Sequence, residues 1–248
     1  MTGEREQIEG RNPVREALRA GVRLDRLVLA KGSGRSLQDI VDLAAAAGIP
    51  IEWKDREWLD RRGRTRAHQG VMGWREPVEY AELPDLLDKA RKSSRPPFFV
   101  ILDGIQDPHN LGSVLRTAEA VGAHGIVIPK RRAVGLTATV AKVSAGAVEY
   151  VPIARVTNLA RAIDDIKEAG LWVVGADMDG NMVHFEANLT GPLALVIGGE
   201  GKGLARLTKE KCDQTVRLPM YGSINSLNAA VAAAVMMYEV VRQRAQTG

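Results

Sequence analysis

The stretch that decides the fold is Phe98–Asp103, which has the sequence FFVILD. A continuous apolar run of this length is typical of a strand that is buried on both faces of a parallel sheet. Outward from it, the pattern predicts a helix over 110–121 and further strands over 125–128, 171–176 and 193–197. Because buried strands and helices alternate, we predict an α/β domain with a parallel sheet and helices on both faces.

The first part of the chain has a different character and is predicted to form a separate, small α/β unit. Short strands are expected over 24–30 and 49–53, with helices between them. The segment 76–97 holds four prolines and the charged run RKSSR, a composition typical of a connector. We therefore expect three parts: a small domain over 1–75, a linker over 76–97 and the larger domain over 98–248.

Composition limits the class of protein. Of the 248 residues, 45% are hydrophobic and 26% are charged, which is the balance of a globular protein, and no apolar run reaches the roughly 18–20 residues of a membrane span. The polar N-terminus lacks the apolar core of a signal peptide, so we expect a cytoplasmic protein. The single Cys212 has no Cys or His neighbour, which argues against a metal or redox role.

The charge of the chain is mildly basic, and its basic residues cluster in one place. The net charge of +4 permits a nucleic-acid partner without establishing one. A cluster of basic residues in the small domain is either a solvated loop or a loop that grips RNA phosphates. Aromatic residues make up only 4% of the chain, so base stacking is predicted to be a minor contribution. The basic cluster comprises Arg61, Arg62, Arg64, Arg66 and His68.

The first motif follows the apolar run at 98–103 and enters the next helix. Its sequence, DGIQDPHNLGSVLRTAE, places Asn110 near the helix start and Arg116 six positions later. In open α/β sheets, ligands bind beyond the carboxyl ends of the strands, where this motif lies. An isolated pair of this kind would equally suit a helix cap and a surface arginine.

The second motif is the glycine-rich loop IGGEGKG at 197–203. Four glycines within six residues demand an unusual backbone and allow close approach to a ligand, although a tight turn at a strand end would also use them. The loop lacks the Gly-Lys-Ser/Thr of a P-loop and the spacing of a dinucleotide site.

The third motif, LPMYGSINSLN at 218–228, precedes a helix that is apolar on nearly all faces. Ser226 or Asn228 could cap that helix, and its all-round apolar character predicts burial in the core or at a subunit interface.

Together, in this order, the three motifs resemble the signature motifs of the SpoU/TrmH family of RNA ribose 2′-O-methyltransferases. The resemblance covers nearly the whole chain and is nearest to members that methylate a guanosine of 23S rRNA. It extends to IEGRNPVREAL at 8–18, AHQGV at 67–71, PKRRA at 129–133, KVSAGA at 142–147 and RVTNL at 155–159.

The resemblance implies a fold of the SPOUT class, in which the catalytic α/β sheet carries a deep trefoil knot, here over about 193–228. It implies an N-terminal RNA-binding domain similar to the L30e ribosomal protein. It also implies S-adenosylmethionine as methyl donor, a homodimer and no metal. The residues expected to contact the donor are Ala176, Gly198, Leu218, Met220 and Leu227.

The resemblance further implies catalytic roles. Arg116 is expected to be central, either as a base or, because a guanidinium stays protonated, as a group that binds phosphate and stabilises the developing alkoxide. Asn110 and Asn228 would position the ribose and Arg116. Glu200 would pair with Arg116 or orient the hydroxyl, and Ser226 would hydrogen-bond in the same pocket.

One departure from the family pattern is Ala229-Ala230, where members often have Val-Ser; both residues are small, so activity should survive. Arg116 is expected to serve the pocket of a partner subunit. Two alternatives stay open: the same chemistry on tRNA or on an rRNA site of antibiotic resistance, and an RNA-binding ribosome-assembly factor without activity.

Overall fold

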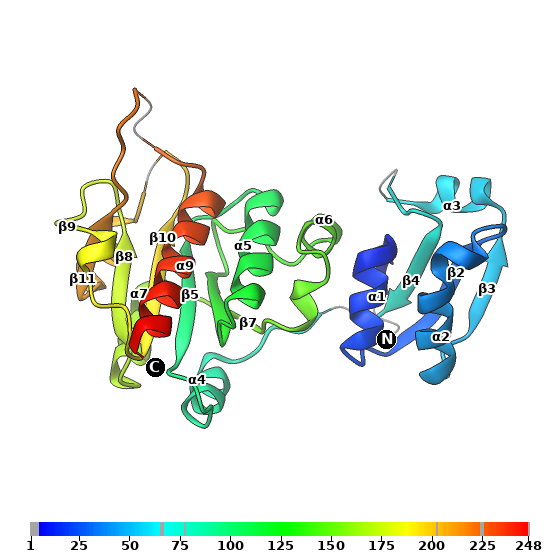
Figure 1. The fold of residues 1–248 in the computed structure, drawn as a ribbon, viewed down its shortest axis with the longest axis horizontal. Helices are drawn as coiled ribbons and strands as arrows, with labels where there is room; N and C mark the ends of the chain where they lie inside the picture. The colour runs from blue at the N-terminus through cyan, green and yellow to red at the C-terminus, as the bar shows by residue number, and fades with distance from the viewer. Residues whose placement is uncertain (1–4, 65–66, 77, 202, 224–225, 248) are drawn as a thin grey trace. The chain divides into compact units, whose positions relative to one another are not determined.

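The computed structural model describes residues 5–64, 67–76, 78–201, 203–223 and 226–247. The chain divides into two compact units, each built from two stretches of sequence (Figure 1). Unit 1 comprises Met1–Glu79 and Leu136–Tyr150, and unit 2 comprises Tyr80–Gly135 and Val151–Gly248.

Unit 1 is built on a four-stranded sheet of order β1-β4-β2-β3. Strand β4 pairs antiparallel with β1 and β2, whereas β2 and β3 are parallel. Along β2, Leu27 and Leu29 face one side of the sheet and Val28 and Ala30 face the other, because side chains alternate along a strand. The strands are β1 (Glu6–Glu9), β2 (Leu24–Ala30), β3 (Ile51–Lys54) and β4 (Val71–Arg75).

Helices cover the two sides of this sheet unequally. The helices α1 (Arg11–Arg19) and α2 (Gln38–Ala46), with a 3-10 turn η1 (Gly34–Leu37) between them, pack over the larger core with Leu27 and Leu29. On the other side, the short helix α3 (Arg56–Arg62) contributes the buried Leu59 and the partly buried Trp58 to a small core. One side of the sheet is therefore only partly covered.

A segment from later in the chain completes unit 1. It contains α6 (Ala138–Val143) and the 3-10 turn η2 (Ala147–Glu149), and α6 packs against β1. The buried Arg75 forms ion pairs with Glu6 at 3.0 Å and with Glu149 at 2.5 Å. Burial raises the pKa of Glu149, and the charge of Arg75 opposes that rise. The segment is thus held by a buried ion pair, which is strongly destabilising to break.

These contacts differ from the predicted boundaries in two places. The prediction assigns the segment containing α6 to the larger domain, because nothing local in its sequence reveals that its packing partner is β1. It also treats 76–97 as a linker, but Leu83, Leu86 and Ala90 of α4 (Leu83–Arg91) are buried in the core of unit 2. The prolines and charged residues of this segment suggest a linker, and the apolar face of α4 is not recognised in its sequence.

Unit 2 is an α/β domain, as predicted, with a seven-stranded sheet of order β7-β6-β5-β10-β8-β11-β9 in which all pairs are parallel. The predicted strand over 98–103 is confirmed as β5, near the middle of the sheet. The strands are β5 (Phe98–Asp103), β6 (Gly125–Pro129), β7 (Ile153–Val156), β8 (Trp172–Ala176), β9 (Met182–Val183), β10 (Leu193–Gly198) and β11 (Gln214–Arg217).

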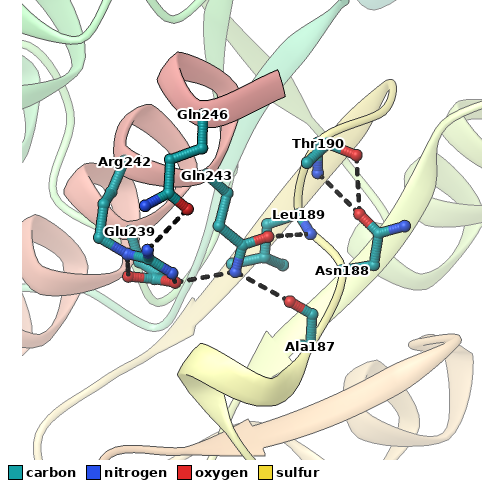
Figure 2. Close-up of polar contacts among 8 residues, drawn as sticks. All are labelled: Ala187, Asn188, Leu189, Thr190, Glu239, Arg242, Gln243 and Gln246. Atoms are coloured by element: carbon teal, nitrogen blue, oxygen red, sulfur yellow. Dashed lines mark hydrogen bonds and ion pairs between the residues drawn. The ribbon is translucent and has the colours of Figure 1, made fainter. Parts of the chain in front are cut away.

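Helices lie on both faces of this sheet. Phe99 and Ile101 of β5 share a core with α4 and α7 (Leu159–Glu168). The helices α5 (Pro108–Ala120) and α9 (Ala229–Thr247) pack against each other, and α9 contacts β10 (Figure 1). The helix α8 (Arg206–Lys211) and the 3-10 turn η3 (His184–Glu186) complete the unit. The segment after η3 is joined to α9 by Gln243, which donates to the Ala187 carbonyl at 2.9 Å and accepts from the Leu189 amide at 2.8 Å (Figure 2).

The trefoil knot over 193–228 stays a prediction, because strand order does not tell how the chain threads and residues 224–225 lie outside the described part. Among the described residues, no helix is both long enough and apolar enough to cross a bilayer.

Candidate active site and donor pocket

A pocket opens at the carboxyl ends of β8, β10 and β11, within unit 2. Its empty volume is about 670 Å³, including space open to solvent, which is within the usual size of small-molecule sites. Apolar and glycine residues predominate in its lining. All five residues expected to contact the methyl donor line it: Ala176, Gly198, Leu218, Met220 and Leu227.

The glycines of the second motif are required by close backbone approach. A Cβ on Gly198 would lie 2.3 Å from the carbonyl carbon of Gly203, and one on Gly199 would lie 2.7 Å from the carbonyl oxygen of Gly104. The loop is closed by a hydrogen bond from the Gly203 amide to the Gly199 carbonyl at 3.1 Å. The loop is therefore a folded wall of the pocket, and a side chain at Gly198 would displace it.

Three predicted catalytic residues, one from each motif, meet beside this loop. Asn110 donates to the Glu200 carboxylate at 3.0 Å, and Asn228 donates to the same Oε1 atom at 2.5 Å and to the Asn110 carbonyl oxygen at 2.9 Å. The backbone amide of Ala229 lies 3.5 Å from that carboxylate. Since hydrogen bonds to a charged acceptor are the stronger ones, the cluster holds the three motifs together.

Asn228 also caps α9, as one of the two interpretations of this residue predicts. Its side-chain oxygen accepts from the amides of Ala230 at 3.0 Å and Val231 at 3.3 Å. Asn110 is not a cap: α5 begins two residues earlier, and the Asp107 side chain caps it by accepting from the His109 amide. Asn110 is instead buried within α5.

Arg116 lies away from the cluster within one chain. Six residues along an α-helix turn through about 240°, so Arg116 leaves α5 on a different side from Asn110. It is exposed, and no hydrogen bond or ion pair joins it to any residue of the described part. The expected contact between Arg116 and Glu200 is therefore not formed in one subunit. Ser226 lines the pocket and is exposed.

A second groove lies on the other side of the cluster. Its empty volume is about 1460 Å³, again with open solvent, and Asp103, Asp107 and Arg132 line it. Asn110 and Glu200 border this groove, and Glu200 also borders the first pocket. The cluster therefore stands between two cavities that can hold two different reactants.

Sequence analysis missed Asp177, which follows β8 and lines the first pocket. Its carboxylate accepts from Lys209 at 2.8 Å and from the Asp179 amide at 3.0 Å. Burial acts to raise the pKa of Asp177, but these hydrogen bonds and the Lys209 charge outweigh it and lower the pKa overall. A polar residue directly after an apolar strand was the available signal.

The predicted RNA-binding residues of unit 1 do not behave alike. Arg61 is exposed and lies 3.8 Å from Glu57, while Arg64 is exposed. Arg62 stacks over Trp58. The side chain of His68 is only 2% exposed: the Gly70 amide donates to its Nδ1, so Nε2 donates to Asp60 at 2.8 Å. His68 is a structural residue, contrary to the prediction, and Arg66 lies outside the described residues.

The thiol of the single cysteine, Cys212, has low reactivity. Burial raises the pKa of Cys212 to about 12, so the reactive thiolate is scarce at neutral pH. Within the described part of the chain, no group of three or more His, Cys, Asp or Glu side chains is arranged to hold a metal ion.

Known proteins resemble this chain over nearly its whole length. Residues 97–238 match the model of the SpoU rRNA Methylase family, and residues 7–81 match that of RNA 2′-O ribose methyltransferase substrate binding. YacO of Bacillus subtilis, named as a TrmH family tRNA/rRNA methyltransferase, is 51% identical over the full length of both chains. A protein of Staphylococcus haemolyticus with the same family name is 45% identical over 97% of each chain.

Solved structures agree as well. The SpoU methyltransferase AviRb of Streptomyces viridochromogenes, solved in complex with S-adenosylmethionine, superposes with a TM-score of 0.80 at 26% identity, over 97% of this chain and 90% of that one. A structure described as an RNA 2′-O ribose methyltransferase has a TM-score of 0.78 at 28% identity, over 97% and 89% of the two chains. Fold, site and likeness together define an RNA methyltransferase that depends on S-adenosylmethionine. The chain belongs to the SpoU rRNA methylase family.

Proposed function

We propose that the chain transfers a methyl group from S-adenosylmethionine to a ribose 2′-hydroxyl of RNA, with a guanosine of 23S rRNA as the target. The observation that carries this proposal is the cluster of Asn110, Glu200 and Asn228 between the first pocket and the second groove. The donor would occupy the pocket and the acceptor ribose the groove, so that the reacting atoms meet at the cluster.

The pocket suits the donor in shape and in charge. It is mainly apolar, with glycine backbone on one wall, as an adenine slot requires. The residues described in its lining include the carboxylates Asp177 and Glu200 and no lysine or arginine. S-adenosylmethionine carries a positive sulfonium and a positive ammonium group, so the acidic lining favours it. When bound, it supplies an electrophilic methyl group with a good leaving group.

The protein's own task is to orient the hydroxyl. When the 2′-oxygen bonds to the methyl carbon, the bond from that carbon to sulfur breaks, S-adenosylhomocysteine leaves, and the hydroxyl proton passes to water. The Glu200 carboxylate is fixed by two asparagine amides, so it can hold a ribose hydroxyl in one geometry without reorganising. We assign Arg116 to phosphate binding and to stabilising the alkoxide that develops on the 2′-oxygen, because its guanidinium remains protonated. Ser226 is positioned at the mouth of the pocket as a further hydrogen-bond donor.

A second copy of the chain is part of this proposal. Helix α9 leaves a stripe of apolar side chains exposed, at spacings of three or four residues that place them on one side. Such a patch is typical of a subunit interface. Because α5 packs against α9, a homodimer through this stripe would carry the exposed Arg116 to the partner's site. The stripe consists of Val231, Val235, Tyr238 and Val241.

The proposal also includes a cytoplasmic location, and it has a second candidate for the RNA target. Relatives are named for both tRNA and rRNA, so tRNA is the second candidate substrate. The intact cluster disfavours an inactive assembly factor, since a binding protein would not need a carboxylate fixed between two cavities.

The test is transfer of labelled methyl groups to unmodified 23S rRNA and to bulk tRNA, followed by mapping of the labelled nucleotide. Glu200→Gln should lose transfer, and Glu210→Gln, which removes an exposed carboxylate of α8, should keep it. Label on a guanosine ribose of 23S rRNA supports the proposal. Label on a base, or equal activity of Glu200→Gln, contradicts it.

A further inference from the structure

Tryptophan is concentrated in unit 1. The protein has four tryptophans, and Trp53, Trp58 and Trp74 lie within 22 residues of one another in this unit. Trp53 is 41% exposed on the edge strand β3, and the other two are only partly buried at the margin of the small core around Leu59. Trp58 and Trp74 therefore both lie on the same side of the sheet and leave part of their indole rings accessible.

Two of these indoles carry a stacked guanidinium. The Arg26 guanidinium carbon lies 4.6 Å from the ring centroid of Trp74, its direct partner in the pairing of β2 with β4. The Arg62 guanidinium carbon lies 4.7 Å from the ring of Trp58, and Lys54 approaches the same ring at 6.0 Å. Two aromatic platforms with cations above them therefore share the side of the sheet that α3 covers incompletely.

The stacks leave binding groups available to a ligand. The side chains of Arg26 and Lys54 are 42% and 41% exposed. A guanidinium above an indole ring keeps N–H groups with which it can bind phosphate. Unpaired RNA bases stack on aromatic rings and on guanidinium planes of this kind.

The charge of this surface favours an anionic partner. Arg26 and Lys54 share one carboxylate, Glu52, at 3.4 and 3.5 Å. Arg62 has no ion pair with a carboxylate in the part of the chain that the structure describes. One carboxylate thus pairs with two of the three cations, and an RNA backbone would supply further negative charge.

We propose that the surface formed by Arg26, Lys54, Trp58, Arg62 and Trp74, called here the tryptophan face, binds unstacked bases and the flanking phosphates of an RNA loop. The proposal rests on the proposed function, since it assigns the recognition of the same RNA substrate to named residues. An RNA duplex is a poorer fit, because its bases are already stacked and it is recognised by shape.

The test is binding of an unmodified 23S rRNA transcript by the full-length protein, measured over a range of salt concentrations. Trp74→Leu should weaken binding by about fivefold to 150-fold, the factor that corresponds to the loss of one stacked base. Arg62→Gln should lower the slope of log K against log salt by about 0.7. The matched control is Arg19→Ala, which removes an exposed charge from α1 on the opposite side of the same sheet and should bind as wild type.

A second readout separates RNA binding from folding. In a Trp172→Phe background, which removes the exposed tryptophan of unit 2, the RNA should quench the remaining indole fluorescence, and Arg26→Gln should change the quenching without changing the melting temperature. For methyl transfer, Arg26→Gln should leave kcat at saturating RNA unchanged and should raise the KM for RNA.

Two outcomes overturn the inference while leaving the proposed function intact. The first is wild-type RNA affinity in Trp74→Leu and Arg62→Gln. The second is a molecular mass of these variants, measured by light scattering, that differs from that of the wild type, because the tryptophan face would then be a subunit contact. Failure of the wild-type protein to methylate RNA that it binds through this face would instead count against the proposed function alone.

Discussion

Gly198→Ala should close the donor pocket. The new Cβ would lie 2.3 Å from the Gly203 carbonyl carbon, so the loop must retreat by about 1.1 Å to restore an ordinary contact of 3.4 Å. The neighbouring atoms are backbone and cannot rotate away. Overpacking of this kind costs about 1–3 kcal/mol of stability. A displacement near 1 Å at a reacting centre can lower the rate by about 10²-fold.

The assay is calorimetric binding of S-adenosylmethionine, combined with single-turnover methyl transfer. We expect at least tenfold weaker donor binding by Gly198→Ala and a much smaller change in RNA binding, since the contacts assigned to the tryptophan face in unit 1 are untouched. Gly191→Ala is the control, because a Cβ at that exposed glycine meets nothing within 4 Å. Donor affinity within twofold of wild type in Gly198→Ala would refute the account of the loop as a rigid wall.

Three further substitutions test the site. Arg116→Ala should abolish methyl transfer while calorimetric donor affinity stays within about twofold, because Arg116 is assigned to the RNA phosphate and the alkoxide and not to the donor; equal loss of both would contradict that. Asn228→Ala and Asn158→Ala each remove a helix N-cap and should each cost about 1 kcal/mol in thermal denaturation, but only Asn228→Ala should also stop transfer. Asp177→Asn should destabilise the protein above the usual carboxyl pKa of 3.8, and the difference from wild type should shrink as the pH falls below it, because a lowered pKa gives stability only while the group is ionised. A difference independent of pH in acid melts would rule out the Asp177–Lys209 pair as its source.

The central strands could be predicted from local sequence because burial on both faces leaves a continuous apolar run. Phe98–Asp103 and Leu24–Ala30 have the predicted bounds. Strand β11 was missed because its sequence, QTVR, contains a single apolar residue and it pairs within the sheet through its backbone. Strand order was also beyond the sequence, since the insertion of β10 between β5 and β8 depends on packing between distant segments.

The five residues that the resemblance implies for donor contact line one pocket. Four of them lie in the second and third motifs, which are local in sequence, and Ala176 lies outside the motifs. The hydrogen bonds of Glu200 with Asn110 and Asn228 were not predicted, because residues so far apart in the sequence give no sign that they are in contact. An aromatic content of 4% averages over the chain and conceals that three of four tryptophans lie in one unit. His68 was misjudged because a histidine in a basic loop looks exposed until its two hydrogen bonds are known.

Unit 1 is built from two stretches of chain, with α6 and the Arg75–Glu149 ion pair in the second. The polypeptide therefore crosses between the units three times, at 79–80, 135–136 and 150–151. A protease cut near residue 80 would leave a nicked protein whose two fragments remain associated and migrate together until denatured. For the same reason, a single recombination point near residue 80 would not transfer the whole of unit 1 to another catalytic domain, because residues 136–150 would be left behind.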